Sequence, residues 1–285
     1  MSSDTPFSYS EFTPVKARKN RRKKTSPPLP AVLVTLREQI RQEKWFAESS
    51  QIIQSSWREF SVHNPGVLCL GLGSPSASPI ARIQLAFLAE TCKQLNVDHD
   101  AVSVYDPVFT ADDLALFADM QMHVLPQDRA RIPPPFPLIE LQAPTICFMP
   151  HCDIELYDAV FRANWSLAGL SNLFVLGNRI REYVDNRPTS ALETTVPCLL
   201  RAAGILESRP LPVSTTWPTA FNNTSVQFRH SRTVVADDVF TALPWQELDS
   251  NAQAQVALAR TDAPENSTET ERCKGVERLE IPAAV

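Results

Sequence analysis

Short apolar runs alternate along the chain with segments whose apolar residues recur at helical spacing. Val67 to Leu72 and Thr145 to Met149 are apolar at successive positions, which is typical of strands buried on both faces of a parallel sheet. Residues 79–95 lie between them and carry two apolar rows spaced three or four residues apart, so they are expected to form a helix with two buried sides. Ser78 is expected to cap this helix, and Pro79 suits its first turn.

The same alternation continues on both sides of this unit. Further strands are predicted at Ala101–Tyr105, Met122–Leu125, Asn172–Leu176 and Phe221–Phe228. Helices are predicted at 33–60, 110–120, 153–165, 179–184 and 192–203. Strands that alternate with helices favour parallel pairing through right-handed crossovers. We therefore expect an α/β fold with a doubly wound, mostly parallel, Rossmann-like sheet and helices on both faces.

Composition divides the chain into four parts. Residues 1–30 are predicted to be a disordered basic tail, 31–60 an N-terminal helical segment, 61–235 the Rossmann-like domain and 236–285 a mostly disordered acidic tail. Residues 126–137 are rich in proline, which predicts a loop there. The chain has no apolar run of about 18 residues, so we expect no membrane span.

Charge and cysteine content narrow the classes of function. The net charge of −5 gives the whole chain no general attraction for nucleic acid. Lys16 to Lys24 is locally basic and resembles a nuclear localisation patch that import machinery would bind; a solvated tail is the alternative. The start of the chain has no signal-peptide pattern. The six cysteines include no CxxC pair, which argues against a disulfide framework. We expect a cytoplasmic or nuclear protein, or one present in both compartments.

Polar residues follow the predicted strands at their carboxyl ends, where open α/β sheets bind ligands. Gly71, Gly73 and Ser74 follow the first strand and could cradle a phosphate, although the third glycine of the dinucleotide motif is missing. Asp106 ends the second strand and could accept hydrogen bonds from a ribose, as in S-adenosylmethionine-dependent methyltransferases. It lies 33 residues after Gly73, whereas dinucleotide sites use about 20. A tight glycine turn and an Asp-Pro turn are the structural alternatives.

His151 and Cys152 follow the strand at 145–149, and Asn178 follows the strand at 172–176. A helix amino end can lower a thiol pKa, but adjacent side chains project apart, so His151 is poorly placed to activate Cys152. No paired spacing supplies the other ligands that zinc needs. The turn after Ser74 lacks the G-x-S-x-G motif of a serine hydrolase. We therefore assign no catalytic and no metal residues, and expect His151 either to bond a neighbouring loop or to contact a ligand.

Several of these segments occur together in one known family. The chain resembles the SRR-like family, named for "sensitivity to red light reduced", over roughly residues 60–230. The resemblance rests on Gly71-Leu72-Gly73-Ser74, Asp106-Pro107, Pro144 to Cys152 (PTICFMPHC), Leu156-Tyr157, Ala163-Asn164-Trp165, Leu176-Gly177-Asn178 and Phe221 to Phe228 (FNNTSVQF). It implies a regulatory protein of circadian and light signalling, haem metabolism or cytoskeletal stability. No catalytic activity comes with it.

Three functional readings follow. The leading one is a regulatory, non-enzymatic protein that acts through unidentified protein partners or through a nucleotide-like small molecule bound by Gly71, Gly73, Ser74, Asp106, His151, Cys152 and Asn178. The second is an enzyme similar to S-adenosylmethionine-dependent methyltransferases. The third is a ligand-free interaction scaffold. The sequence identifies no cofactor.

Overall fold

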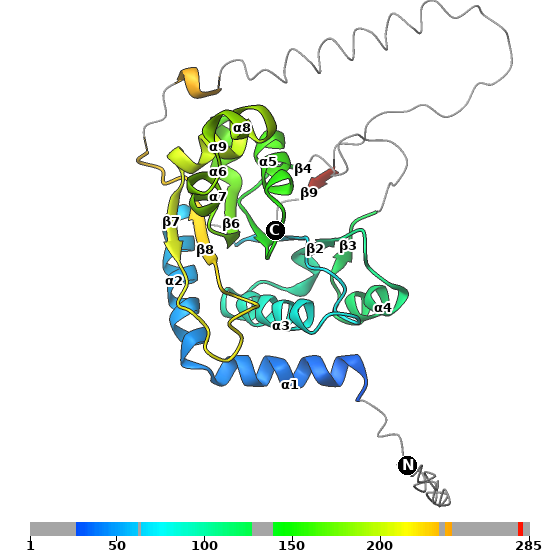
Figure 1. The fold of residues 1–285 in the computed structure, drawn as a ribbon. Coiled ribbons are helices and arrows are strands. Elements are labelled where there is room, and N and C mark those ends of the chain that lie inside the picture. The colour runs from blue at the N-terminus through cyan, green and yellow to red at the C-terminus, as the bar shows by residue number, and fades with distance from the viewer. Residues whose placement is uncertain (1–26, 62–63, 127–138, 234–236, 241–278, 282–285) are drawn as a thin grey trace, which may run out of the picture.

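A computed structural model describes residues 27–61, 64–126, 139–233, 237–240 and 279–281. Its centre is a 7-stranded sheet in the order β3-β2-β1-β5-β6-β8-β7 (Figure 1). The strands are β1 (Gly66–Leu70), β2 (Val102–Tyr105), β3 (His123–Val124), β5 (Thr145–Met149), β6 (Leu173–Asn178), β7 (Glu207–Pro210) and β8 (Thr224–Phe228). The strands from β3 to β6 pair in parallel, whereas β8 is antiparallel to both β6 and β7. The predicted doubly wound, mostly parallel sheet is confirmed.

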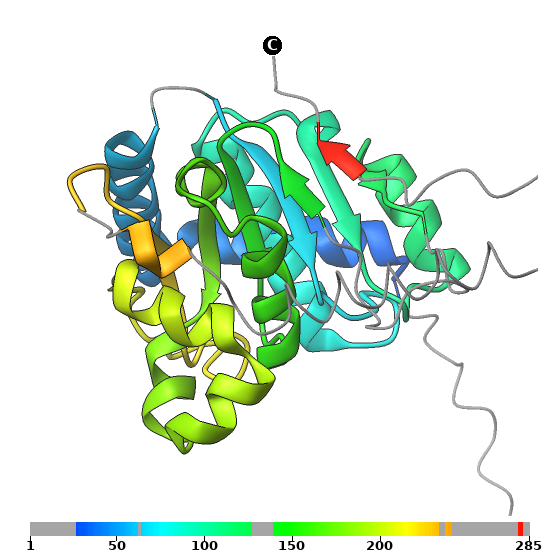
Figure 2. The same ribbon diagram turned by 90° about the horizontal axis from the view of Figure 1, so that it is seen from above.

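Helices cover both faces of this sheet (Figure 2). One face carries α1 (Leu29–Gln42), α2 (Lys44–Phe60), α3 (Pro79–Gln94) and α4 (Ala111–Asp119). The other carries α5 (Ile154–Ala163), α6 (Leu167–Asn172), α7 (Ile180–Asp185), α8 (Thr189–Thr195) and α9 (Pro197–Ile205). Because successive side chains of a strand point to opposite faces, Cys69 packs into the first core and Leu70 into the second. All five residues of β1 are therefore buried.

Local sequence accounts for the predicted helix starts. The Ser78 side chain accepts a hydrogen bond from the Ala81 N–H at the start of α3. Thr110 and Asp113 form a capping box at the start of α4. Asp153 stands at the cap position of α5, but its side chain makes no cap hydrogen bond.

Two helices expected to be continuous are broken. The predicted helix at 33–60 divides into α1 and α2 at Glu43, whose backbone is extended, and the two helices diverge from this point (Figure 1). The predicted helix at 192–203 is replaced by α8 and α9, with the break at Val196. The next residue is Pro197, which disfavours helical backbone in the residue before it.

Four strands and helices were not predicted: β7, α6, β4 (Ile139–Leu141) and β9 (Leu279–Ile281). β7 is a half-exposed edge strand of mainly polar sequence that ends in Pro210, so it lacks the apolar pattern of the central strands. β4 pairs outside the main sheet with β9 (Leu279–Ile281). The Asn164 side-chain amide bonds the backbone of Leu141 and Ile139 and so ties the end of α5 to β4.

Several expectations concern parts of the chain that lie outside the described residues. They are the disorder of the basic tail up to residue 26, most of the proline-rich loop and nearly all of the acidic tail. Within the described ranges, no helix is both long and apolar enough to cross a membrane.

Candidate functional site

The carboxyl ends of β1 and β5 lie side by side at the point where the sheet changes direction. From β1 the strand order runs to β2 and β3 on one side, and from β5 it runs to β6 on the other. Doubly wound proteins bind ligands in the crevice at this position. Gly71 and Gly73 follow β1 with φ angles of 64° and 74°, a left-handed backbone that glycine adopts without steric cost. The turn after β5 contains His151 and Cys152.

Cys152 fills the space between these two turns. Its side chain is 5% exposed, and its Sγ lies 3.3 Å from the Leu70 carbonyl oxygen at the end of β1. A Cβ added at Gly71 would lie 2.5 Å from that sulfur, so glycine is required here for close approach as well as for its φ angle. Burial, with the nearby Asp106 and Asp153 carboxylates, raises the pKa of the Cys152 thiol. The thiol is therefore protonated at neutral pH and is a poor nucleophile.

The Asp106 side chain bonds the backbone of the glycine turn. Its carboxylate accepts hydrogen bonds from the Gly73 N–H at 2.7 Å and from the Val108 N–H at 3.0 Å. The side chain is 6% exposed. The backbone donor that a phosphate would use in a dinucleotide site is thus taken by a carboxylate of the protein itself.

A second buried carboxylate, that of Asp113, takes donors near the amino ends of α3 and α4. It accepts bonds from the Ser74 hydroxyl at 2.6 Å, the Ser76 N–H at 2.7 Å and the Thr110 N–H at 2.9 Å. Burial alone would raise the pKa of Asp113, but the hydrogen bonds from Ser74, Thr110 and Ser76 outweigh burial and lower it. Asp113 is not among the residues predicted for the site; the Thr110-x-x-Asp113 spacing is the sequence signal that its carboxylate bonds the start of α4.

His151 and Asn178 join the β5 turn to its neighbours. His151 has a φ of 52°, and its N–H donates to the Asn178 Oδ1 at 3.2 Å. Its ring Nε2 lies 3.1 Å from the Ala220 carbonyl oxygen, so in this tautomer Nε2 is the donor. The expected bond from His151 to a neighbouring loop is confirmed. Asn178 in turn donates from Nδ2 to the Tyr183 hydroxyl at 2.7 Å.

Two tyrosines that sequence reasoning did not select complete this network. The fully buried Tyr157 hydroxyl donates to the Met149 carbonyl oxygen at 2.6 Å and accepts from the Asn178 N–H at 2.7 Å. The Tyr183 hydroxyl donates to the Cys152 carbonyl oxygen at 2.9 Å. Burial raises the pKa of both phenols, so both remain protonated donors. Helical spacing does not reveal where the hydroxyl of Tyr157 will bond.

The seven predicted site residues thus lie at or just past neighbouring strand ends, in two networks. Gly73 and Asp106 are bonded directly, and Ser74 bonds to Asp113 beside them. His151, Cys152 and Asn178 form the second network, which meets the first where Cys152 approaches Gly71. Among the described residues, no group of three or more His, Cys, Asp or Glu side chains could hold a metal ion. The arrangement is suited to holding two strand-to-helix turns together.

The fold and these networks define the class: a doubly wound, Rossmann-like α/β domain whose switch-point turns are bonded to each other. The chain belongs to the SRR1 domain family, whose model matches residues 36–228. It is similar to "SRR1-like protein" of Mus musculus, with 29% identity over 137 residues, which is 48% of this chain and 53% of the relative. It is also similar to "Protein SENSITIVITY TO RED LIGHT REDUCED 1" of Arabidopsis thaliana, with 30% identity over 116 residues and 40% of each chain covered. These matches span about half of each relative or less.

Proposed function

We propose that this SRR1-family chain is a regulatory protein that acts through contacts with protein partners and not by turnover at its strand ends. Family membership supports the regulatory role. The proposal that no turnover occurs at the strand ends is supported by the closure of the crevice. Cys152 fills the crevice, and Asp106 bonds the Gly73 N–H. A ligand in the usual position would have to displace both groups. The partner proteins are unidentified.

The resemblance implies the biological setting. The name of the Arabidopsis relative refers to sensitivity to red light, which supports a proposal of light or circadian signalling. Haem metabolism and cytoskeletal regulation are the other settings proposed on the resemblance alone. We further propose nuclear as well as cytoplasmic localisation, with import through the basic cluster at residues 16–24.

A second candidate function is favoured by the topology of the sheet. The antiparallel β8 lies between β6 and β7 at one end of an otherwise parallel sheet. S-adenosylmethionine-dependent methyltransferases have a sheet of this kind, with a glycine turn after the first strand and an acidic residue at the end of the second. The Gly71 turn and Asp106 hold those places. The likeness is one of fold, and one fold can serve many unrelated functions.

Ligand binding by the purified chain separates these candidates. Native mass spectrometry should show no nucleotide-like ligand retained by the chain, and millimolar S-adenosylmethionine should produce neither heat in calorimetry nor a shift in melting temperature. Stoichiometric retention of a nucleotide-like molecule, or saturable binding of S-adenosylmethionine, would contradict the proposal. Turnover of any substrate that is lost in His151→Ala would do so too, because the His151 side chain lies at the exposed edge of the site.

A further inference from the structure

A polar pocket lies at the edge of the sheet opposite to the glycine turn. Its volume is about 570 Å³, within the usual range for small-molecule sites. It is lined by Arg37 of α1, Lys93 of α3, residues 96–100 of the connection that leads into β2, and Gln121 after α4. Because this connection precedes β2, the pocket lies near the amino ends of the strands. It is therefore separate from the crevice between β1 and β5.

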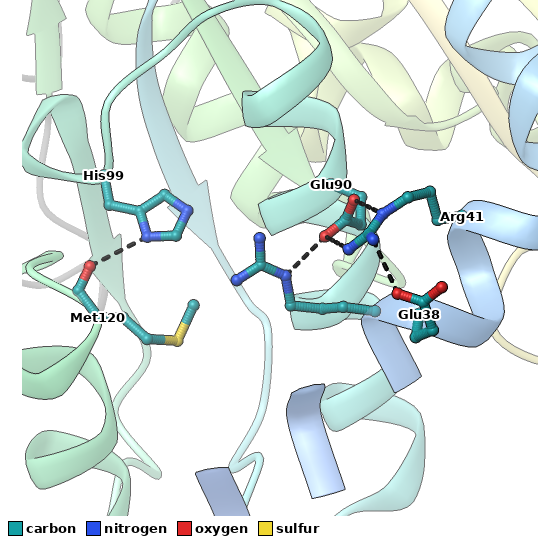
Figure 3. A network of polar contacts seen from close by, with 6 residues as sticks. Glu38, Arg41, Glu90, His99 and Met120 are labelled. Carbon is teal, nitrogen blue, oxygen red and sulfur yellow. Dashed lines mark hydrogen bonds and ion pairs between the residues drawn. The ribbon is translucent and has the colours of Figure 1, made fainter. Parts of the chain in front are cut away.

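Arg37 is held in place by a buried carboxylate, that of Glu90, which Figure 3 shows beside Arg41. The Glu90 side chain is fully buried, and its oxygens accept from Arg37 Nε at 2.7 Å and from Arg41 Nε at 3.0 Å. Burial acts to raise the pKa of Glu90, but the bonds and charges of the two arginines outweigh burial and lower it. Glu90 is thus ionised and fixes Arg37 through Nε. Among the described residues, no protein group bonds the two terminal nitrogens of Arg37, so they remain available as a two-donor fork.

Charges of both signs line the pocket in separate places. Arg37 and the exposed Lys93 come from the two helices, and Lys93 lies three residues after Glu90 on α3. Asp98 and Asp100 come from the connection before β2. Both α3 and α4 end at the pocket, and the carbonyl end of a helix favours a positive group. His99 fixes the connection, because its Nδ1 lies 3.1 Å from the Met120 carbonyl oxygen at the end of α4 (Figure 3).

We propose that this pocket binds a small zwitterion, a molecule with one acidic group and one ammonium group joined by a short chain. The acidic group is bound by the fork of Arg37 and by Lys93, and the ammonium group by Asp98, Asp100 and the helix carbonyl ends. Asp98 and Asp100 disfavour polyanions such as nucleoside phosphates, since they would repel the additional charge. The site gives the regulatory domain an effector pocket that is independent of the crevice between β1 and β5.

The test uses the full chain and phosphoethanolamine as the probe, with inorganic phosphate and ethanolamine as its two halves. Phosphoethanolamine should shift the backbone NMR signals of residues 96–100 and 121 saturably, and each half alone should bind at least about tenfold more weakly. No shift at about 10 mM phosphoethanolamine would overturn the proposal. Equal binding of inorganic phosphate would also overturn it, because the pocket would then hold an adventitious ion only.

Arg41 supplies a matched control. Arg41→Lys changes a residue that also bonds Glu90 but does not line the pocket, so it should bind phosphoethanolamine as the unchanged chain does. Arg37→Lys removes the fork and should weaken binding about tenfold or more. Lys93→Ala, at an exposed position, should weaken binding without loss of stability. Equal effects of the two arginine changes, or no effect of Lys93→Ala, would contradict the assignment.

Discussion

Replacement of Gly71 by alanine should destabilise the domain for two separable reasons. The left-handed backbone at φ 64° costs a residue with a Cβ about 1–2 kcal/mol. The new Cβ would also lie 2.5 Å from the Cys152 sulfur, and overpacking of this kind costs about 1–3 kcal/mol. Gly71→Ala should therefore lower the free energy of unfolding by about 2–5 kcal/mol.

Gly73 and Cys152 provide the controls. Gly73 has a similar φ of 74°, but an added Cβ would meet only the Ala81 Cβ at 3.6 Å, so Gly73→Ala should show only the backbone cost of about 1–2 kcal/mol. Cys152→Ala removes the sulfur and should relieve most of the overlap in the double variant with Gly71→Ala. The double-mutant cycle should therefore give a coupling of about 1–3 kcal/mol.

Urea unfolding at neutral pH measures each of these free energies. The midpoint should shift while the slope remains constant, because the surface exposed on unfolding is unchanged. The reasoning would be refuted by equal losses for Gly71→Ala and Gly73→Ala together with no coupling to Cys152. That result would mean that the turns after β1 and β5 do not touch in solution.

Three further predictions concern a buried hydroxyl, a buried carboxylate and the basic cluster at residues 16–24. Tyr157→Phe removes a buried hydroxyl with two backbone partners and should lower the free energy of unfolding in urea by about 1–3 kcal/mol; no loss would contradict its role as a tie between β5 and β6. The pKa of Asp113 is lowered in the folded state, so its ionised carboxylate stabilises the fold above the unfolded-state pKa of about 3.9, and this contribution is lost as pH falls through the lower folded-state pKa. The free energy of unfolding of the Asp113→Asn variant should therefore decline less steeply in acid than that of the unchanged chain. Parallel plots of this free energy against pH for the two proteins would refute the prediction. Deletion of residues 16–24 should reduce nuclear accumulation of a fluorescent fusion, and an unchanged distribution would argue against an import signal.

Sequence reasoning located the central strands because their signals are local. β5 begins and ends at the predicted residues, Thr145 and Met149, since Pro144 and Pro150 bound its apolar run. Parallel strands place their carboxyl ends at one edge of the sheet, so Asp106 and Gly73 could be expected to lie near each other. Their direct hydrogen bond confirms this proximity.

Most contacts of the buried side chains at the site could not be predicted, because they join segments that are distant in the sequence. The bond of Asp113 to Thr110 is local, but its other partners, Ser74 and Ser76, come from the turn after β1. The partners of the Tyr157 hydroxyl lie on β5 and β6, and helical spacing does not reveal them. The same holds for the contact of Cys152 with Gly71, which requires β1 and β5 to be adjacent. Polar edge elements such as β7 also escape detection, since a half-exposed strand has no apolar run to identify it.

The reactivity of Cys152 measures whether the crevice between β1 and β5 is closed in the folded protein. The native chain would be treated with iodoacetamide at neutral pH, and the modified peptides quantified by mass spectrometry over time. Cys69 and Cys147 are fully buried within β1 and β5 and serve as internal references. We predict that Cys152 is modified as slowly as Cys69 and Cys147, because its sulfur becomes accessible to the reagent only when the protein unfolds. Rapid modification of Cys152 while Cys69 and Cys147 remain protected would show that the crevice opens in the folded protein, and would contradict the account.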